Sequence, residues 1–207
     1  MRLSEKTLEL NICAQISSFL RGTAKPFWFG LTQKQEAVAG FDACAKLNGR
    51  LLVFQFKASN NVLKNGDRKF LAPHYQMSAL SRVAGSAARS VFYAFPLIGN
   101  TLELKSNPNL LSQTWLLDVK QLSHLGPPTK SDGTWRKNGC HNVYVRKGSA
   151  TVHSEPLETD LISMHEFVTA GFPGLDGFQW RFDGNAEAFW EFCSLLGPGA
   201  RGMFTYD

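Results

Sequence analysis

An Asn-Gly pair at residues 48 and 49 constrains the fold of this chain more than any other feature of its sequence. Residues 40–59 read GFDACAKLNGRLLVFQFKAS, which is two largely apolar runs joined by that pair. Asn-Gly is typical of the type I′ turn, because both central residues of this turn need a positive φ. A two-residue loop at Asn48-Gly49 predicts a β-hairpin in which Leu47 faces Arg50.

The register of this hairpin gathers three polar residues at one end of an otherwise apolar pair of strands. It predicts Asp42 opposite Gln55, and directly opposed residues have Cβ atoms roughly 4.5–5.5 Å apart. Since side chains alternate along a strand, Lys57 lies on the same face as Gln55. Strands that are apolar on both faces are usually central and covered on both sides. Polar groups there are costly unless a partner such as a metal ion or a phosphate satisfies them.

The segments around the hairpin predict helices and strands in a definite order. Apolar residues at helical spacing predict a helix over residues 3–20, with Ser4 as its N-cap. A strand is predicted at residues 27–31, the hairpin supplies two more, and a helix at 73–84 and a strand at 90–97 follow. Helices that alternate with apolar strands in this way predict an α/β fold with a mixed sheet covered on both faces.

The hairpin residues resemble the catalytic core of the PD-(D/E)xK nuclease superfamily, the restriction-endonuclease-like fold. The sequence has Gly40-Phe41-Asp42, a turn, and an apolar run that ends in Gln55-Phe56-Lys57. This pattern is similar to the variant of Mrr-type restriction endonucleases, in which Gln replaces Glu. The resemblance covers roughly residues 3–97. It implies an α-β-β-β-α-β core, in the order that periodicity and turn chemistry predict.

The resemblance also implies an activity, which is metal-dependent hydrolysis of DNA phosphodiester bonds in a restriction, repair or phage-defence setting. Mg²⁺ or Mn²⁺ would be the cofactor, with Asp42, the amide oxygen of Gln55 and the backbone carbonyl of Phe56 as ligands. Lys57 would orient or deprotonate the attacking water and stabilise the negative charge that develops.

Two further acidic residues compete for a place in this catalytic site. In the resembled family a Glu on the first helix often completes the metal site, which points to Glu9 as a catalytic residue and metal ligand. Glu36 precedes Asp42 by six residues, close enough to approach the same site from a loop. Both also fit as ordinary solvated carboxylates. Asp42 and Lys57 likewise fit an ordinary ion pair between strands.

Basic and polar residues after the hairpin are candidates for contact with DNA. Lys64, Arg68 and Lys69 form a small basic cluster that would hold the DNA backbone if it lies beside the site. His74 and Gln76 stand at the start of the second predicted helix, and a helix N-terminus attracts anions. The cluster fits a solvated loop equally well, and His74 fits a capping role.

The residues after Gly99 predict an α+β elaboration of the core. The predicted elements are a strand at 114–119, a long loop at 126–139, a hairpin at 142–153, and helices at 161–170 and 185–196. We interpret residues 1–99 as the nuclease-like core and residues 100–207 as an extension that packs on it within the same domain.

Charge and composition limit the partners that we expect. The formal net charge of +5 permits nucleic-acid binding without demonstrating it. The sequence has no apolar run of ~18 residues and no Cys-x-x-Cys pair, so we expect a cytoplasmic, reduced protein without a membrane partner. The resemblance implies DNA as its partner. A homodimer or a larger defence or repair complex fits this expectation. The absence of a phosphate-cradling Gly-rich motif argues against a kinase, an NTPase or a dinucleotide enzyme.

Two other interpretations stay open. Because Gln55 stands at the family's Glu position, the chain also fits a catalytically inactive nuclease-fold module that binds nucleic acid or assembles a complex. An unrelated α/β protein whose hairpin imitates the motif is the third possibility. Metal-dependent cleavage separates the first two, and a hairpin in which Asp42 and Gln55 do not pair would favour the third.

Overall fold

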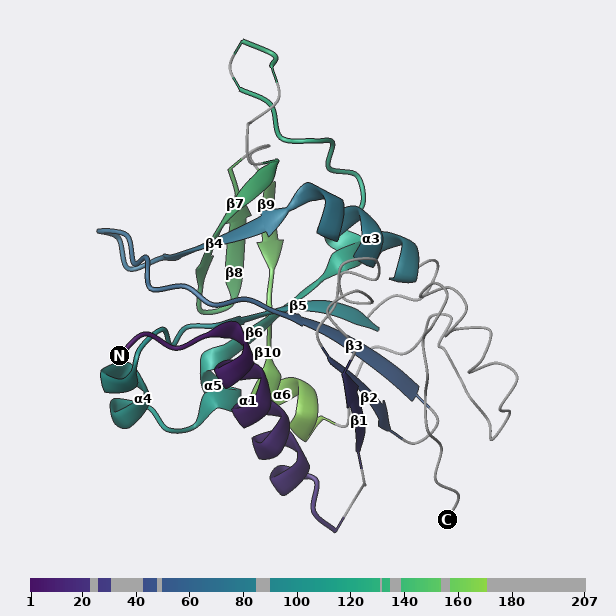
Figure 1. Cartoon of the computed structure of the whole chain (residues 1–207), viewed down its shortest axis with the longest axis vertical. Helices are drawn as coiled ribbons and strands as arrows, with labels where there is room; N and C mark the ends of the chain where they lie inside the picture. The colour runs from purple at the N-terminus through teal and green to yellow at the C-terminus, as the bar shows by residue number, and fades with distance from the viewer. Residues whose placement is uncertain are drawn as a thin grey trace.

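A computed structural model gives the fold of the chain. It describes residues 1–22, 26–30, 43–47, 50–84, 90–130, 132–134, 139–153 and 157–170. Within these residues the chain is a mixed α/β structure with two sheets and several helices (Figure 1). The described helices are α1 (Glu5–Phe19), α3 (His74–Ala84), α4 (Thr101–Ser106), α5 (Leu110–Gln113), the 3₁₀ turn η1 (Val119–Leu122) and α6 (Met164–Thr169).

The larger sheet is mixed, with six strands among the described residues in the order β1-β2-β3-β5-β6-β10. These strands are β1 (Phe27–Gly30), β2 (Ala43–Leu47), β3 (Arg50–Phe56), β5 (Val91–Pro96), β6 (Thr114–Asp118) and β10 (Ile162–Ser163). Strands β1, β2 and β3 are antiparallel to one another, β5 is parallel to β3, and β6 is antiparallel to β5. Strands β6 and β10 come from the predicted extension and complete one edge of this sheet.

The β2–β3 hairpin has the register that the Asn-Gly pair predicts. Leu47 pairs with Arg50, and the pairing continues to Ala43 opposite Phe54. The turn residues and Asp42 lie outside the described residues. The prediction of the register is therefore confirmed over the described pairs, and the pairing of Asp42 with Gln55 stays a prediction.

A second, antiparallel sheet contains four strands among the described residues, in the order β4-β7-β8-β9. They are β4 (Arg68–Pro73), β7 (Cys140–Arg146), β8 (Ser149–Val152) and β9 (Leu157–Asp160). The predicted hairpin of β7 and β8 is confirmed, and Gly148 in its turn has a φ of 84°. Strand β4 differs from the sequence prediction, which has a polar turn region up to Arg68 and no strand. Strand β4 is defined by its pairing with β7, which continues along the whole length of β4.

The larger sheet has an apolar core on each face. On one face, Phe54 and Phe56 pack with the buried side of α1 and with α5 and α6. On the other face, Tyr93 and Phe95 meet α3 and the second sheet, and the rings of Phe95 and Phe70 lie 4.8 Å apart between centroids. Strand β5 is buried at every position, as expected for a central strand covered on both sides.

Helices α1, α3 and α6 lie where the sequence predicts helices, whereas α4, α5 and η1 correspond to no predicted helix. Helix α1 begins as predicted, with Ser4 Oγ accepting a hydrogen bond from the Thr7 N–H at 3.1 Å. The helix predicted at 161–170 is divided, because Ile162–Ser163 pairs with β6 as strand β10 before α6 begins. The helix predicted at 185–196 lies outside the described residues. Among the described helices, none has the length and apolar character needed to cross a membrane.

Candidate active site

Gln55 and Lys57 lie at the C-terminal end of β3, on the face that looks toward α3 and the second sheet. The alternation of side chains directs Phe54 and Phe56 into the core beneath α1, so Gln55 and Lys57 point to the opposite face. Both are buried, with 1% of Gln55 and 7% of Lys57 exposed. The Lys57 N–H donates to Ala94 O at 3.0 Å, which continues the pairing with β5 beyond the strand. The structure therefore brings together two of the predicted catalytic residues.

The side-chain amide of Gln55 contacts another predicted ligand. Gln55 Nε2 donates a hydrogen bond to the backbone carbonyl of Phe56 at 3.0 Å. The amide and carbonyl oxygens of these two residues are hard, neutral donors of the kind that Mg²⁺ accepts. They fit a divalent ion only together with an anionic ligand.

Lys57 brings a positive charge into this largely apolar site. The ion pairs between described residues are Lys6–Glu9, Arg68–Glu103 and Arg146–Glu158. Within the described part of the chain, then, no carboxylate neutralises the Lys57 ammonium. Burial of a charge is costly unless it is paired, so this ammonium would gain from an anion such as Asp42 or a phosphate. Asp42 and Glu36 both lie outside the described residues.

Glu9 lies on α1, whose buried side covers the face with Phe54 and Phe56. Its carboxylate is buried and accepts from Lys6 Nζ at 2.7 Å. Burial, followed by the negative charge of Glu9, raises the pKa of the neighbouring Cys13 thiol to about 12. Among the described contacts none joins Glu9 to Gln55 or Lys57, and its role as a metal ligand stays a prediction. In the same described residues no three His, Cys, Asp or Glu side chains form a group that could hold a metal ion.

Arg68, predicted in a DNA-binding cluster, has a different environment. Only 5% of the residue is exposed. Its Nη1 donates to Ser59 O at 2.6 Å and its Nη2 pairs with Glu103 at 2.8 Å. A guanidinium that is buried and bound to two protein groups is not available to a phosphate, so the expectation that Arg68 contacts DNA is corrected.

The other predicted DNA contacts lie at separate places. Lys64 is exposed in the loop before β4, and Lys69 is half-buried on β4. The Nδ1 atom of His74, at the start of α3, lies 3.1 Å from His141 Nε2 and is used in that hydrogen bond. Gln76 Oε1 is buried and accepts no hydrogen bond from the described residues. Of these four residues, the two lysines combine accessibility with positive charge.

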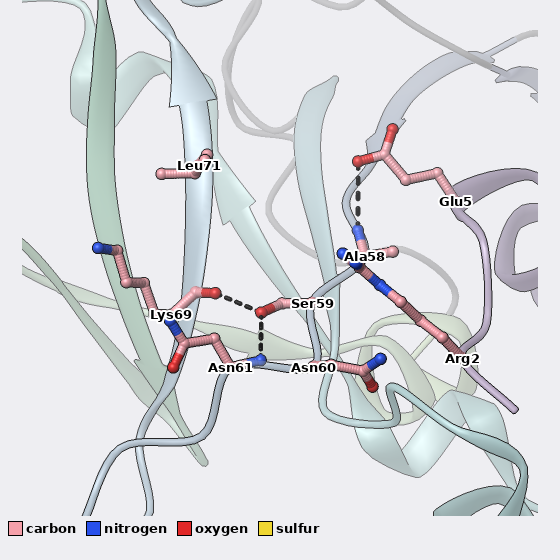
Figure 2. Close-up of a pocket in the computed structure, with 8 residues that line it drawn as sticks. All are labelled: Arg2, Glu5, Ala58, Ser59, Asn60, Asn61, Lys69 and Leu71. Atoms are coloured by element: carbon pink, nitrogen blue, oxygen red, sulfur yellow. Dashed lines mark hydrogen bonds between the residues drawn. The ribbon is translucent and has the colours of Figure 1, made fainter. Parts of the chain in front are cut away.

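A cavity of about 550 Å³ lies between the N-terminal end of α1 and strand β4. Figure 2 shows Lys69 and Leu71 on one side, Arg2 and Glu5 on the other, and Ala58 to Asn61 between them. Ser59 Oγ donates to Lys69 O and accepts from the Asn61 N–H at 3.1 Å, which fixes this segment against β4.

Sequence reasoning missed this cavity because three distant segments build it. Arg2 and Glu5 precede the hairpin, Asn60 and Asn61 follow it, and Lys69 belongs to a strand that the sequence did not predict. A usable signal was the polar run from Ser59 to Asn61 shortly after the apolar strand, because polar residues that follow a buried strand often line a surface cavity.

Comparison of the chain with protein-family models, with curated proteins and with solved structures finds no match of any of the three kinds. The interpretation of the site therefore depends on its own residues and their geometry.

Proposed function

We propose that the protein is a metal-dependent nuclease that hydrolyses DNA phosphodiester bonds at the C-terminal end of β3. The observation that carries the proposal is the buried pair of Gln55 and Lys57 on one face of this strand, in a hairpin with the predicted register. The proposal adds Asp42 as the next residue of the ladder, opposite Gln55. It includes a cytoplasmic setting in restriction, repair or phage defence, as a homodimer or in a larger complex.

The arrangement of the first elements supports a restriction-endonuclease-like core as part of this proposal. Three antiparallel strands are followed by helix α3 and by β5, which lies parallel to β3. Helix α1 covers one face of this unit and α3 the other. Strand β4 is an addition to the expected order, and it belongs to the second sheet rather than to this unit.

The residues would divide the chemistry as follows. A bound Mg²⁺ or Mn²⁺ supplies an activated water and neutralises charge on the scissile phosphate. Asp42, the Gln55 amide oxygen and the Phe56 carbonyl would hold that ion. Lys57 donates hydrogen bonds to the phosphate oxygen on which negative charge develops, and its buried position strengthens that interaction because little water competes.

A second candidate function is an inactive module with the same fold that binds nucleic acid or assembles a complex. Two observations favour it. Gln55 replaces the acidic residue of the resembled motif, which lowers the negative charge that a metal ion would meet at this site. The Gln55 Nε2 donor also occupies one lone pair of the Phe56 carbonyl. The two candidates differ in one measurable property, which is cleavage.

The test is incubation of the purified protein with supercoiled plasmid and with single-stranded DNA, in Mg²⁺, in Mn²⁺ or in EDTA. We expect metal-dependent nicking by the wild-type protein. Lys57→Ala and the similarly shaped Lys57→Met should lose roughly 100-fold or more of this activity, as is typical for a group that acts in the transition state. Lys105→Met, which removes an exposed charge on α4, is the matched control and should cleave normally.

Because Lys57 is buried, circular dichroism and thermal unfolding must show that both Lys57 variants fold. Folded Lys57 variants with full activity would exclude the proposed site. Wild-type protein that binds DNA and cleaves it with neither metal would favour the inactive module.

A further inference from the structure

The second sheet has a core face and an outer face. Phe70, Val143 and Val152 belong to the core, so the alternating residues of the same strands point outward. On β4 these include Leu71, which is 48% exposed. On β7 they include Tyr144, which is half-buried. The outer face is therefore a strand-built surface with a large aromatic side chain on it.

Two rings and an ammonium group lie together on this face. The ring centroids of Tyr144 and His153 are 4.2 Å apart, and His153 is exposed. Lys69, directly paired with Tyr144 on the neighbouring strand, has its Nζ 6.0 Å from the centre of the tyrosine ring. Cross-strand pairs of this kind stabilise a sheet, and this effect alone would explain the pair of Lys69 and Tyr144. A base-sized aromatic surface beside a cation also meets the requirements of nucleotide binding.

The outer face continues into the cavity described above. Lys69 and Leu71 belong to both, and Arg2 adds a second positive charge across the cavity. At the far side of the sheet Arg146 pairs with Glu158 at 3.1 Å, so these charges compensate each other. The face therefore offers Lys69 and Arg2 to a phosphate at the cavity, whose lining also includes the Glu5 carboxylate, which accepts from the Ala58 N–H at 3.3 Å.

We propose that the outer face of β4, β7 and β8 binds single-stranded DNA, with bases stacked on Tyr144 and His153 and phosphates beside Lys69 and Arg2. Bases of a duplex are paired and stacked, so they cannot lie on exposed rings, whereas unpaired bases can. The inference rests on the proposed function, since it names the substrate class of that nuclease. The strand would run from the aromatic surface into the cavity, whose lining includes Lys69 and Arg2.

The test measures binding in EDTA, where no metal-dependent cleavage takes place. Fluorescence anisotropy would follow a labelled single strand of about 12 nucleotides, within the site sizes typical of single-strand binding, a duplex of the same length and an RNA of the same sequence. We expect the DNA single strand to bind most tightly. Tyr144→Ala should weaken it about fivefold or more, whereas Tyr144→Phe, which keeps the ring, should bind like wild type. Lys69→Ala should reduce the slope of log affinity against log salt by about 0.7.

Tyr75→Ala is the matched control, because Tyr75 is 69% exposed but lies on helix α3. Unchanged binding in both Tyr144→Ala and His153→Ala would overturn the inference, and so would equal or tighter binding of the duplex or the RNA. Cleavage is measured separately. Cleavage by wild type together with normal DNA binding by Tyr144→Ala would support the proposed nuclease function and contradict DNA binding at the aromatic surface. DNA binding that depends on Tyr144, without cleavage in either metal, would support binding at the aromatic surface and contradict the nuclease function.

Discussion

Gly99 is a residue at which three segments of the chain meet. A Cβ on it would overlap Ser59 O, Asn60 Oδ1 and the Arg68 guanidinium, so a larger residue would push this contact apart. Its N–H donates to Glu103 Oε2 at 2.7 Å, and the same oxygen pairs with Arg68. The buried guanidinium thus connects the segment that forms the cavity wall to helix α4.

Removal of the carboxylate that holds Arg68 should be costly. Glu103→Ala leaves a buried guanidinium and the Gly99 N–H without their acceptor. We expect a loss of about 2 kcal/mol in the free energy of unfolding, less than for a fully enclosed pair because the Glu103 side chain is 33% exposed. Urea denaturation measures this loss.

The exposed pair of Arg146 and Glu158 provides the control for this measurement. Both side chains are more than half exposed, so Glu158→Ala should cost less than about 1 kcal/mol. Equal losses in the two variants would show that burial of Arg68 does not determine its contribution.

At the level of single residues, the sequence predicted the positions of Gln55 and Lys57 on β3 better than the environment of the basic cluster that follows. Gln55 and Lys57 could be located because the register of a hairpin follows from its turn residues. Arg68 and Lys69 are adjacent and equally basic in the sequence, yet one is buried and the other is not. Which of them points inward depends on the pairing of β4 with β7 and on Glu103, and neither is local to the basic cluster.

At the scale of elements, helix α1 depends on its N-cap. Ser4 Oγ accepts the Thr7 N–H, one of the donors that a helix leaves without an intrahelical partner. Ser4→Ala should lower the free energy of unfolding by about 1 kcal/mol, as measured by thermal or urea unfolding. Ser163, the N-cap of α6, makes no capping hydrogen bond through its side chain. Ser163→Ala should therefore lower the free energy of unfolding by less than Ser4→Ala does. A larger loss in Ser163→Ala would contradict the capping role of Ser4.

Several elements with local signals were predicted, whereas two strands that depend on distant partners were not. The β2–β3 and β7–β8 hairpins follow from turn residues, and α1 follows from its apolar spacing and cap. Strand β4 is defined by its pairing with β7, and the two-residue strand β10 by its pairing with β6, in each case from a remote part of the chain. Such pairing cannot be read from the residues of a strand alone.

On the scale of the whole molecule, the two sheets share one core. The ring of Phe70, from the second sheet, packs on that of Phe95, from the larger one. Phe70→Ala should therefore destabilise both sheets together, by about 3–5 kcal/mol. Hydrogen exchange should show lower protection in β5 and in β7 by similar amounts.

Leu71→Ala is the matched control in the same strand, because Leu71 is 48% exposed. It should change the free energy of unfolding by less than about 0.5 kcal/mol. Loss of protection confined to β7 in Phe70→Ala would show instead that the second sheet unfolds as a unit of its own.

The pairing of β4 with β7 has a consequence for the synthesis of the protein. Strand β4 ends at Pro73 and its only neighbour within the described sheet begins at Cys140. A ribosome that adds roughly 5–20 residues per second needs about 3–13 s to span that interval. During this time the edge of β4 that pairs with β7 has no partner strand, so the nascent chain presents unpaired backbone groups to chaperones and to other chains. Slower translation before β7 should therefore lower the yield of folded protein, whatever the stability of the finished molecule.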